Sequence, residues 1–180
     1  MGFNIDSVKF NIIAAFDKNR GIGVKGKIPW DIPREMRYFK KITTETWNSH
    51  KENVVIMGRK TWESIPENFR PLKGRKNIVI SRNRVVSPEE VLRANSLEGA
   101  IWMASLFRSS VESLFIIGGG SIYSQAIDLP GCNRIFATEI RESYVCDTFF
   151  PVFLDRFRFK ETIYMSRDPL YLNNLYERLE

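Results

Sequence analysis

One carboxylate stands among apolar residues that recur at helical spacing. Glu35 lies three residues after Ile32 and four before Phe39, so it projects from the apolar face of a predicted helix over residues 28–42. Burial would raise the pKa of such a group, so a carboxylate at this place requires a structural or functional explanation. A buried ion pair with an arginine is the alternative that the residues leave open. The apolar stripe of this helix consists of Ile32, Met36, Phe39 and Ile42.

Three consecutive glycines, Gly118 to Gly120, follow an apolar run and precede a predicted helix that ends at Ile127. Backbone N–H groups at such a turn can approach a diphosphate closely, because no side chain keeps the ligand away. A tight turn selected for packing alone is the other interpretation.

Basic residues follow two other predicted strands. The segment 59–61, Arg-Lys-Thr, comes directly after one strand, and Ser81 with Arg82 ends another. Each alone is typical of a solvated surface, but together they indicate an anion clamp, and a 2′-phosphate would explain their number.

A further arginine, Arg75, lies in a loop restricted by Pro71 and Gly74. A guanidinium held in this way suits bidentate pairing with a carboxylate, at about 1.5–3 kcal/mol for a charged hydrogen bond. An exposed arginine on a turn is the competing interpretation.

The segment 21–26, Gly-Ile-Gly-Val-Lys-Gly, matches the G-x-G-x-x-G pattern of dinucleotide-binding turns. That pattern requires its glycines to lead straight into a helix, which Pro29 and Trp30 prevent here. We therefore expect no dinucleotide turn at this place, but either a flexible surface loop or a lid over the strand ends.

Alternating strands and helices are expected to position these residues. The fold class is α/β, a single domain over residues 1–180, with a mainly parallel central sheet, helices on both faces and an antiparallel C-terminal hairpin. The first helix is expected to begin at an Asp31 N-cap with Pro33 in its first turn, and Ser96 to cap another helix. Ligands should gather at the carboxyl ends of the strands. The expected strands are 10–16, 54–57, 77–81, 114–117, 134–140, 157–165 and 170–179, with loops at 17–27 and 68–76.

Composition excludes several classes of protein. The net charge is +6, but the 27 basic and 21 acidic residues are interspersed, which argues against nucleic-acid and membrane partners. Two cysteines, Cys132 and Cys146, and one histidine, His50, make a metal site or a disulfide scaffold improbable. No signal peptide or membrane span is present, so a cytoplasmic protein is expected.

The chain as a whole resembles dihydrofolate reductase of the eukaryotic type. The resemblance covers nearly the whole length, in the order and spacing of its motifs. These are Ile13-Ala14-Ala15, Gly21-Ile22-Gly23, Pro29-Trp30, Glu35 with Phe39 and Lys40, the run from Met57 to Pro66, Arg70-Pro71-Leu72, Gly74-Arg75, the run from Asn77 to Arg82, Ile116-Ile117-Gly118-Gly119, Tyr123, Thr138 and Asp147-Thr148-Phe149-Phe150-Pro151.

The resemblance implies reduction of 7,8-dihydrofolate to tetrahydrofolate by NADPH, in support of one-carbon metabolism and thymidylate synthesis, in a monomer that binds antifolates. Glu35 matches the family's acid, which binds the pterin N3 and 2-amino group and assists protonation of N5; Thr138 matches its hydrogen-bond partner, and Trp30 completes the implied catalytic set. The implied substrate pocket adds Ile13, Met36, Phe39, Ile65, Leu72, Arg75 for the glutamate tail, Ile117 and Tyr123. The implied cofactor site holds Ala15, Ile22, Gly58, Arg59, Lys60, Thr61, Ser81, Arg82, Ile117, Gly119, Gly120, Ser121, Ile122 and Tyr123.

Two other functions compete with this one. A related NADPH-dependent reductase for another pterin or pyrimidine would share the glycine turn but would not need Arg75. A nucleic-acid-binding module would need clustered aromatic and basic residues, which the sequence lacks. Fusion to thymidylate synthase is open in this family, and we expect a complete monomer.

Overall fold

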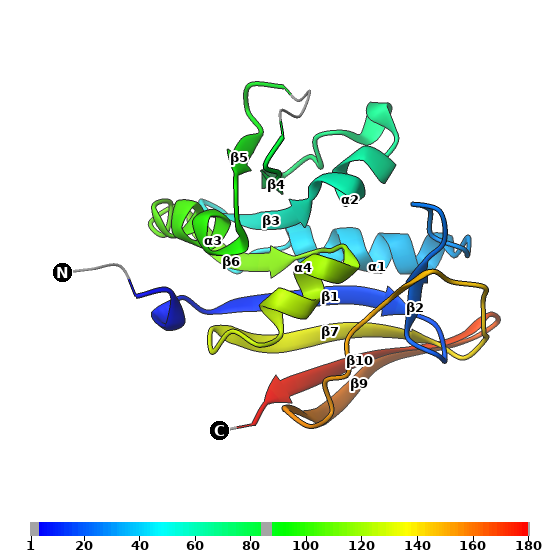
Figure 1. Cartoon of the computed structure of the whole chain (residues 1–180). Helices are drawn as coiled ribbons and strands as arrows, with labels where there is room; N and C mark the ends of the chain where they lie inside the picture. Colours follow the sequence, from blue (N-terminus) through cyan, green and yellow to red (C-terminus); the bar gives the residue numbers. More distant parts are fainter. Residues whose placement is uncertain (1–3, 84–87, 180) are drawn as a thin grey trace.

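Eight strands form one β-sheet at the centre of the computed structural model, which describes residues 4–83 and 88–179 (Figure 1). They are β1 (Phe10–Phe16), β3 (Glu52–Gly58), β4 (Arg75–Ile80), β5 (Leu92–Ala94), β6 (Val111–Ile116), β7 (Cys132–Ile140), β9 (Phe157–Arg167) and β10 (Leu170–Arg178). Their order across the sheet is β5-β4-β3-β6-β1-β7-β10-β9. All pairs are parallel except β7 with β10 and β10 with β9. The sheet is therefore mainly parallel with an antiparallel C-terminal hairpin, as the sequence predicts.

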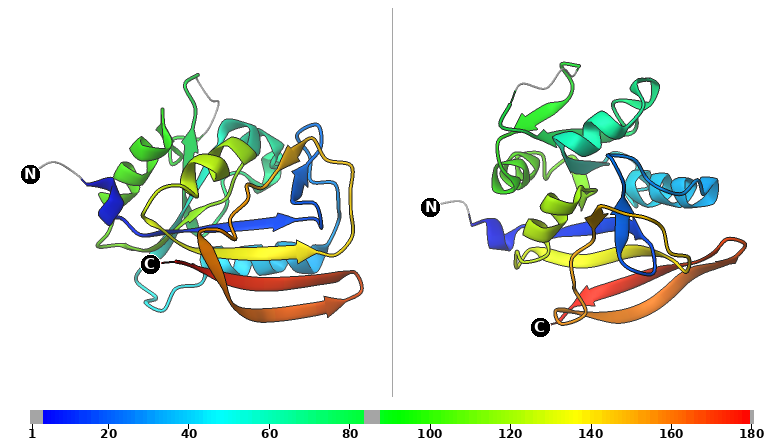
Figure 2. Two further views of the ribbon diagram at one scale, coloured as in Figure 1. Left: turned by 60° about the horizontal axis from the view of Figure 1, so that its bottom comes forward. Right: turned by 45° about the vertical axis from the view of Figure 1, so that its right-hand side comes forward.

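Helices cover both faces of this sheet (Figure 2). They are α1 (Pro33–Thr44), α2 (Arg59–Ser64), α3 (Leu97–Ser105) and α4 (Gly120–Ala126), with short 3-10 turns η1 (Ile5–Ser7) and η2 (Glu67–Phe69). In β1, Ile12 packs with residues of α3 and α4, whereas Ile13 belongs to a second cluster with Phe39 of α1 and Trp62 of α2. Side chains on a strand alternate between its two faces, so each apolar strand fills both cores. Within the described part of the chain, no helix combines the length and the apolar character that crossing a bilayer requires.

The start of α1 differs from the prediction. Ile32, not Asp31, is the N-cap residue, and no side chain caps the helix. A residue that precedes proline is disfavoured in the helical region, so Ile32 stays extended and the helix begins at Pro33, which needs no N–H partner there. Ile32 is buried with Ile140 and Tyr171, which anchors this end of the helix.

Three short strands and one boundary also differ from the prediction. Arg75 is the first residue of β4 and does not lie in a loop, because it pairs in register with Asn53 of β3. Part of the predicted loop 17–27 forms β2 (Gly21–Gly23), which pairs with β8 (Thr148–Phe149), and β5 lies within the loop 82–96. Residues 84–87 of that loop lie outside the described residues. Two- and three-residue strands carry too few side chains to show a period in sequence.

Gly131, which precedes β7, packs closely against the segment that leads into β1, and Gly99 in α3 provides a comparison. A side chain at Gly131 would overlap the backbone carbonyl oxygen of Val8, whereas one at Gly99, inside α3, would meet Ser96 Oγ at an ordinary 3.4 Å. We expect Gly131→Ala to lower the free energy of unfolding by about 1–3 kcal/mol, as overpacking does. Gly99→Ala is the control and should raise it by up to about 1 kcal/mol, because alanine favours helix. Urea unfolding measures both, and equal effects would contradict the packing at Gly131.

Candidate active site

A buried carboxyl group faces the sheet from the first turns of α1. Glu35 is 6% exposed, and no hydrogen bond or ion pair of its side chain occurs within the described residues. Loss of water raises the pKa of Glu35 to about 7. Its charge in turn raises the pKa of Tyr38 and Tyr123, behind the larger effect of burial on each phenol. The ion pair with an arginine that the sequence left open is therefore absent from the described part of the chain, and Glu35 can exchange a proton near neutral pH.

The hydroxyl of Thr138 does not donate to Glu35. Thr138 lies buried in β7, and its Oγ1 donates to Asn173 Oδ1 of β10 at 3.0 Å. The register of the antiparallel pair places these two residues opposite each other. Because a threonine hydroxyl has one proton, Thr138 cannot also donate to the Glu35 carboxylate, while its lone pairs can still accept a hydrogen bond from a protonated acid. Asn173 was not foreseen from the sequence, since its place depends on strand register.

Apolar side chains surround the same region of the sheet. Ile13, in the middle of β1, and Ile117, directly after β6, are buried in one cluster with three partly buried residues, Phe39, Ile65 and Leu72. Met36 departs from the predicted stripe. Met36 is 50% exposed, because it projects about 100° around the helix from the buried Glu35 and so lies at the edge of the apolar face of α1. Trp30 lies half-buried beside Tyr144, with ring centroids 5.4 Å apart.

A buried arginine stands at the other end of α1. Arg75 is 8% exposed; its Nη1 donates to Thr43 Oγ1 at 2.7 Å and its Nε to the Lys73 carbonyl at 3.2 Å. Its guanidinium lies 5.9 Å from the centre of the Phe39 ring. No acidic side chain pairs with Arg75 among residues 4–83 and 88–179, and burial lowers its pKa. A guanidinium has five N–H donors, so this cation retains capacity for an anionic group from a ligand.

The glycine turn lies next to the start of α2. Gly58, at the end of β3, donates its N–H to the carbonyl of Gly118 at 2.8 Å, and the Gly118–Gly119 peptide bond is cis. Side chains at Gly119 and Gly120 would approach Thr61 Oγ1 to 3.2 Å and Thr148 Cγ2 to 2.9 Å. Gly119 and Gly120 therefore form an open turn, the glycine cradle, that side chains would narrow. No side chain caps the first turn of α4, which follows it.

The basic residues near this turn are not equivalent. Arg59 forms an ion pair with Glu63 at 2.8 Å, whereas the exposed Lys60 and Arg82 have no acidic partner among the described residues. Ser81 donates its hydroxyl to the Asn83 carbonyl at 2.9 Å. Of the three cations predicted for the cofactor site, Lys60 and Arg82 therefore have no acidic partner in the described part of the chain.

The carboxyl group and the glycine turn meet across β1 and β6. The Tyr123 hydroxyl, from α4 behind the turn, donates to the Ile13 carbonyl of β1 at 2.9 Å. The charge of Glu35 also contributes, behind burial, to the raised pKa of Tyr123. Ile117, which immediately precedes the glycine turn, belongs to the same apolar cluster as Ile13. The two predicted binding regions are thus connected through Tyr123 and β1, on the side of the sheet where parallel α/β folds bind ligands.

Two aspartates, to which the sequence analysis assigned no role, hold the segment 17–27 in place. Asp17 Oδ1 accepts the N–H groups of Asn19 and Gly21 at 2.8 and 2.7 Å, and its Oδ2 accepts that of Tyr144 at 2.8 Å. Asp147 Oδ2 accepts the N–H of Lys25 at 2.7 Å, and such bonds lower the pKa of Asp147. An Asp that precedes a Gly-containing turn is the signal that would have found Asp17. The segment 17–27 is therefore hydrogen-bonded to the 144–149 region rather than a free loop.

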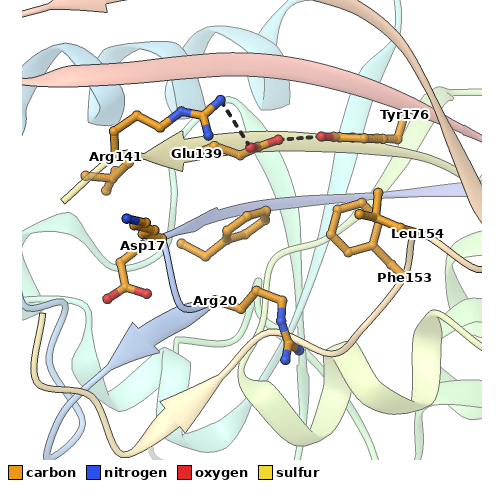
Figure 3. Close-up of a pocket in the computed structure, with 10 residues that line it drawn as sticks. Asp17, Arg20, Glu139, Arg141, Phe153, Leu154 and Tyr176 are labelled. Carbon is orange, nitrogen blue, oxygen red and sulfur yellow. Dashed lines mark hydrogen bonds and ion pairs between the residues drawn. The ribbon is translucent and has the colours of Figure 1, made fainter. Parts of the chain in front are cut away.

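A small pocket of about 170 Å³ lies at the base of this segment (Figure 3). Two of its charged groups face each other: Glu139 accepts a hydrogen bond from the Tyr176 hydroxyl, and Arg141 lies 4.0 Å from the same carboxylate. It is separate from the side of the sheet that carries Glu35, because Phe16 and Phe153 on its wall belong to the cluster under α3 and α4.

The raised pKa of Glu35 predicts a pH-dependent stability. Between the ordinary pKa of 4.5 and about 7, the folded chain keeps a proton that the unfolded chain releases, so stability is lost as pH rises through this range. The full loss is about 3 kcal/mol, since one pKa unit corresponds to about 1.4 kcal/mol. We expect Glu35→Gln, measured by urea unfolding, to gain up to about 3 kcal/mol over the native chain between about pH 4 and about pH 8. Glu161→Gln, at an exposed site on β9, is the control and should change by less than about 0.5 kcal/mol. A gain no larger for Glu35→Gln than for Glu161→Gln would contradict the burial argument.

Comparisons with known proteins agree with this architecture. A family model described as dihydrofolate reductase matches residues 9–174. The chain is 44% identical over 151 residues to dihydrofolate reductase of Heliothis virescens, covering 82% of this chain and 81% of that protein. It is 44% identical over 147 residues to bifunctional dihydrofolate reductase-thymidylate synthase 2 of Arabidopsis thaliana, covering 79% of this chain but 26% of that longer protein. The structure of Schistosoma mansoni dihydrofolate reductase aligns with a TM-score of 0.80 at 35% identity, over 96% of this chain and 99% of that one. The chain belongs to the dihydrofolate reductase family.

Proposed function

We propose that this chain reduces 7,8-dihydrofolate to 5,6,7,8-tetrahydrofolate with a hydride from NADPH. The observation that carries the proposal is Glu35, a buried carboxyl group with a pKa of about 7 and no protein partner among the described residues. A group with a pKa near the working pH is suited to proton transfer. Family membership supplies the reaction class, and the local chemistry is consistent with it.

The spacing of charges along α1 suits an elongated substrate with a polar ring at one end and an acid at the other. Glu35, Phe39 and Thr43 follow one another on one side of the helix, and Arg75 binds Thr43. Eight residues of helix separate Glu35 from Thr43, which corresponds to about 12 Å. A folate has a pterin ring, an aromatic linker and a glutamate tail in this order, matching the acid, the apolar walls and the guanidinium.

Glu35 has two tasks in this proposal. Its carboxyl group binds the pterin N3 and 2-amino group and assists protonation at N5. A protonated ring beside it would favour the carboxylate and so oppose the effect of burial on its pKa. The apolar side chains of Ile13, Phe39 and Ile117 keep water from the reacting atoms, which strengthens these interactions.

The cofactor side consists of the glycine cradle and the free cations. A diphosphate would bind at the backbone N–H groups of Gly119, Gly120 and Ser121, beside Thr61, because no larger side chain obstructs them. Lys60 and Arg82, with Ser81, would select a 2′-phosphate, while Ala15 and Ile22 would contact the nicotinamide end. A bound reduced nicotinamide supplies the hydride, and the protein supplies position and dryness.

An assay of the whole chain tests the reaction. Protein mixed with NADPH and dihydrofolate should consume NADPH, followed by loss of its absorbance. Glu35→Gln should lower kcat by about 10²–10⁴-fold, because general acid–base groups contribute that much, and should leave the Kd for NADPH within about twofold. No turnover of dihydrofolate by the native chain, with turnover of another pterin or a pyrimidine, would favour the related reductase instead.

Substitution of Arg75 tests the orientation of the substrate. Arg75→Ala should raise the KM for dihydrofolate by about 10–100-fold, the equivalent of one or two charged hydrogen bonds, and should change the KM for a tail-less dihydropterin by less than about threefold. Thr43→Val is the matched control, since it removes the neighbouring hydroxyl but keeps the guanidinium. Equal effects of Arg75→Ala on both substrates would refute the assignment of the tail to Arg75.

A further inference from the structure

A second, larger groove is lined by residues of α1 and of the β9–β10 hairpin. It encloses about 520 Å³. It is lined by Arg34, Arg37, Tyr38, Lys41, Ile42, Ile163, Tyr164, Tyr171 and Asn173. Three of these residues also adjoin the candidate active site: Ile42 packs against the cluster of Ile13 and Ile117, the charge of Glu35 raises the pKa of Tyr38 behind burial, and Asn173 accepts from Thr138.

The periodicity of α1 separates the cations of this groove from the active site. With 100° between successive residues, Arg34, Arg37 and Lys41 share one side of the helix, whereas Glu35 and Phe39 project from the roughly opposite side. The three cations of the groove therefore face away from Glu35 and Phe39.

The groove is positively charged and its cations are uncompensated. Arg34, Arg37 and Lys41 are exposed, and none of them has an ion pair within residues 4–83 and 88–179. No aspartate or glutamate lines the groove. In the small pocket of Figure 3, by contrast, Arg141 faces Glu139. Three free cations spread over about 10 Å of helix, in a concave surface, favour a ligand with more than one negative group.

Aromatic rings form the opposite wall. Tyr164, 43% exposed, and Tyr171 lie with ring centroids 6.0 Å apart, and Ile163 next to them is 44% exposed. The hydroxyl of Tyr38 is buried without a hydrogen-bond partner among the described residues. Phenol rings offer flat apolar surface to a planar ligand, so charge lies on one wall and ring contact on the other.

We propose that this groove binds a planar organic polyanion, with an aromatic ring against Tyr164 and acid groups at Arg34, Arg37 and Lys41. This site is additional to the proposed reductase activity and does not depend on it. Charge complementarity selects the anion, and the exposed tyrosine selects a ring over an inorganic ion.

Fluorescence polarisation of pyrenetetrasulfonate with the whole chain tests the site, in the presence of saturating NADPH so that the glycine cradle is occupied. We expect the double variant Arg34→Gln, Lys41→Gln to weaken binding by at least about tenfold, because two charge-assisted contacts are lost. Tyr164→Ser should weaken it by about threefold or more. The matched control Arg158→Gln removes an exposed arginine of β9 outside the groove and should leave binding within about twofold.

Two further probes separate charge from ring recognition. Singly charged pyrenesulfonate should bind at least about tenfold more weakly than the tetrasulfonate, and inorganic triphosphate should compete poorly. Equal binding of the tetrasulfonate to the double variant and to Arg158→Gln would overturn the site. Competition by triphosphate at the same concentration as the tetrasulfonate would overturn the ring contact. Unchanged Kd for NADPH in every variant keeps this result distinct from any failure of the proposed reaction.

Discussion

The desolvation of one carboxyl group is the constraint on which the rest of the site depends. Glu35 would lower its free energy by reaching water, and only a helix that cannot fray or rotate keeps it inside. The two ends of α1 are fixed in different ways. At the first turn, buried Ile32 packs against Ile140 and Tyr171. At the last turn, Asn53 Nδ2 donates to the carbonyls of Thr43 and Glu45 at 3.2 and 3.0 Å. Burial of Glu35 thus lowers the stability of the fold, and the packing at the two ends of α1 offsets this loss.

A second buried charge stands on the same side of the helix, but too far away to neutralise the first. Arg75 lies near Thr43, about 12 Å of helix from Glu35, and no acid reaches it within the described residues. Direct pairing would have compensated both charges within the protein. Their separation leaves an acid at one end and a cation at the other, with the Phe39 ring between them. Under the proposed function, a ligand of matching polarity would supply both counter-groups at once.

The sequence was informative wherever one residue type decides the local structure. Apolar runs predicted the long strands, Ser96 was correctly identified as the cap of α3, and Glu35 was found because it interrupts an apolar stripe. What failed depends on contacts between distant segments. The donation from Thr138 to Asn173 follows from the register of β7 and β10, and the pairing of β2 with β8 follows from aspartates whose partners lie more than 100 residues away. The cap at Asp31 failed for a local reason, the proline two residues later.

The two sides of α1 affect each other through charge. Burial and then Tyr164 are the largest causes of the raised pKa of Tyr171. Arg34 lowers this pKa and Glu35 raises it, so charges on both sides of the helix act on a phenol that lines the groove. Exposed cations are screened by water, which explains why burial rather than Arg34 sets the raised pKa of Glu35. A polyanion in the groove would displace that water and neutralise the cations. The nearby negative charge would then favour the protonated form of Glu35, so that occupancy of the groove and the proton on the acid are linked by electrostatics across one helix, without a change of shape.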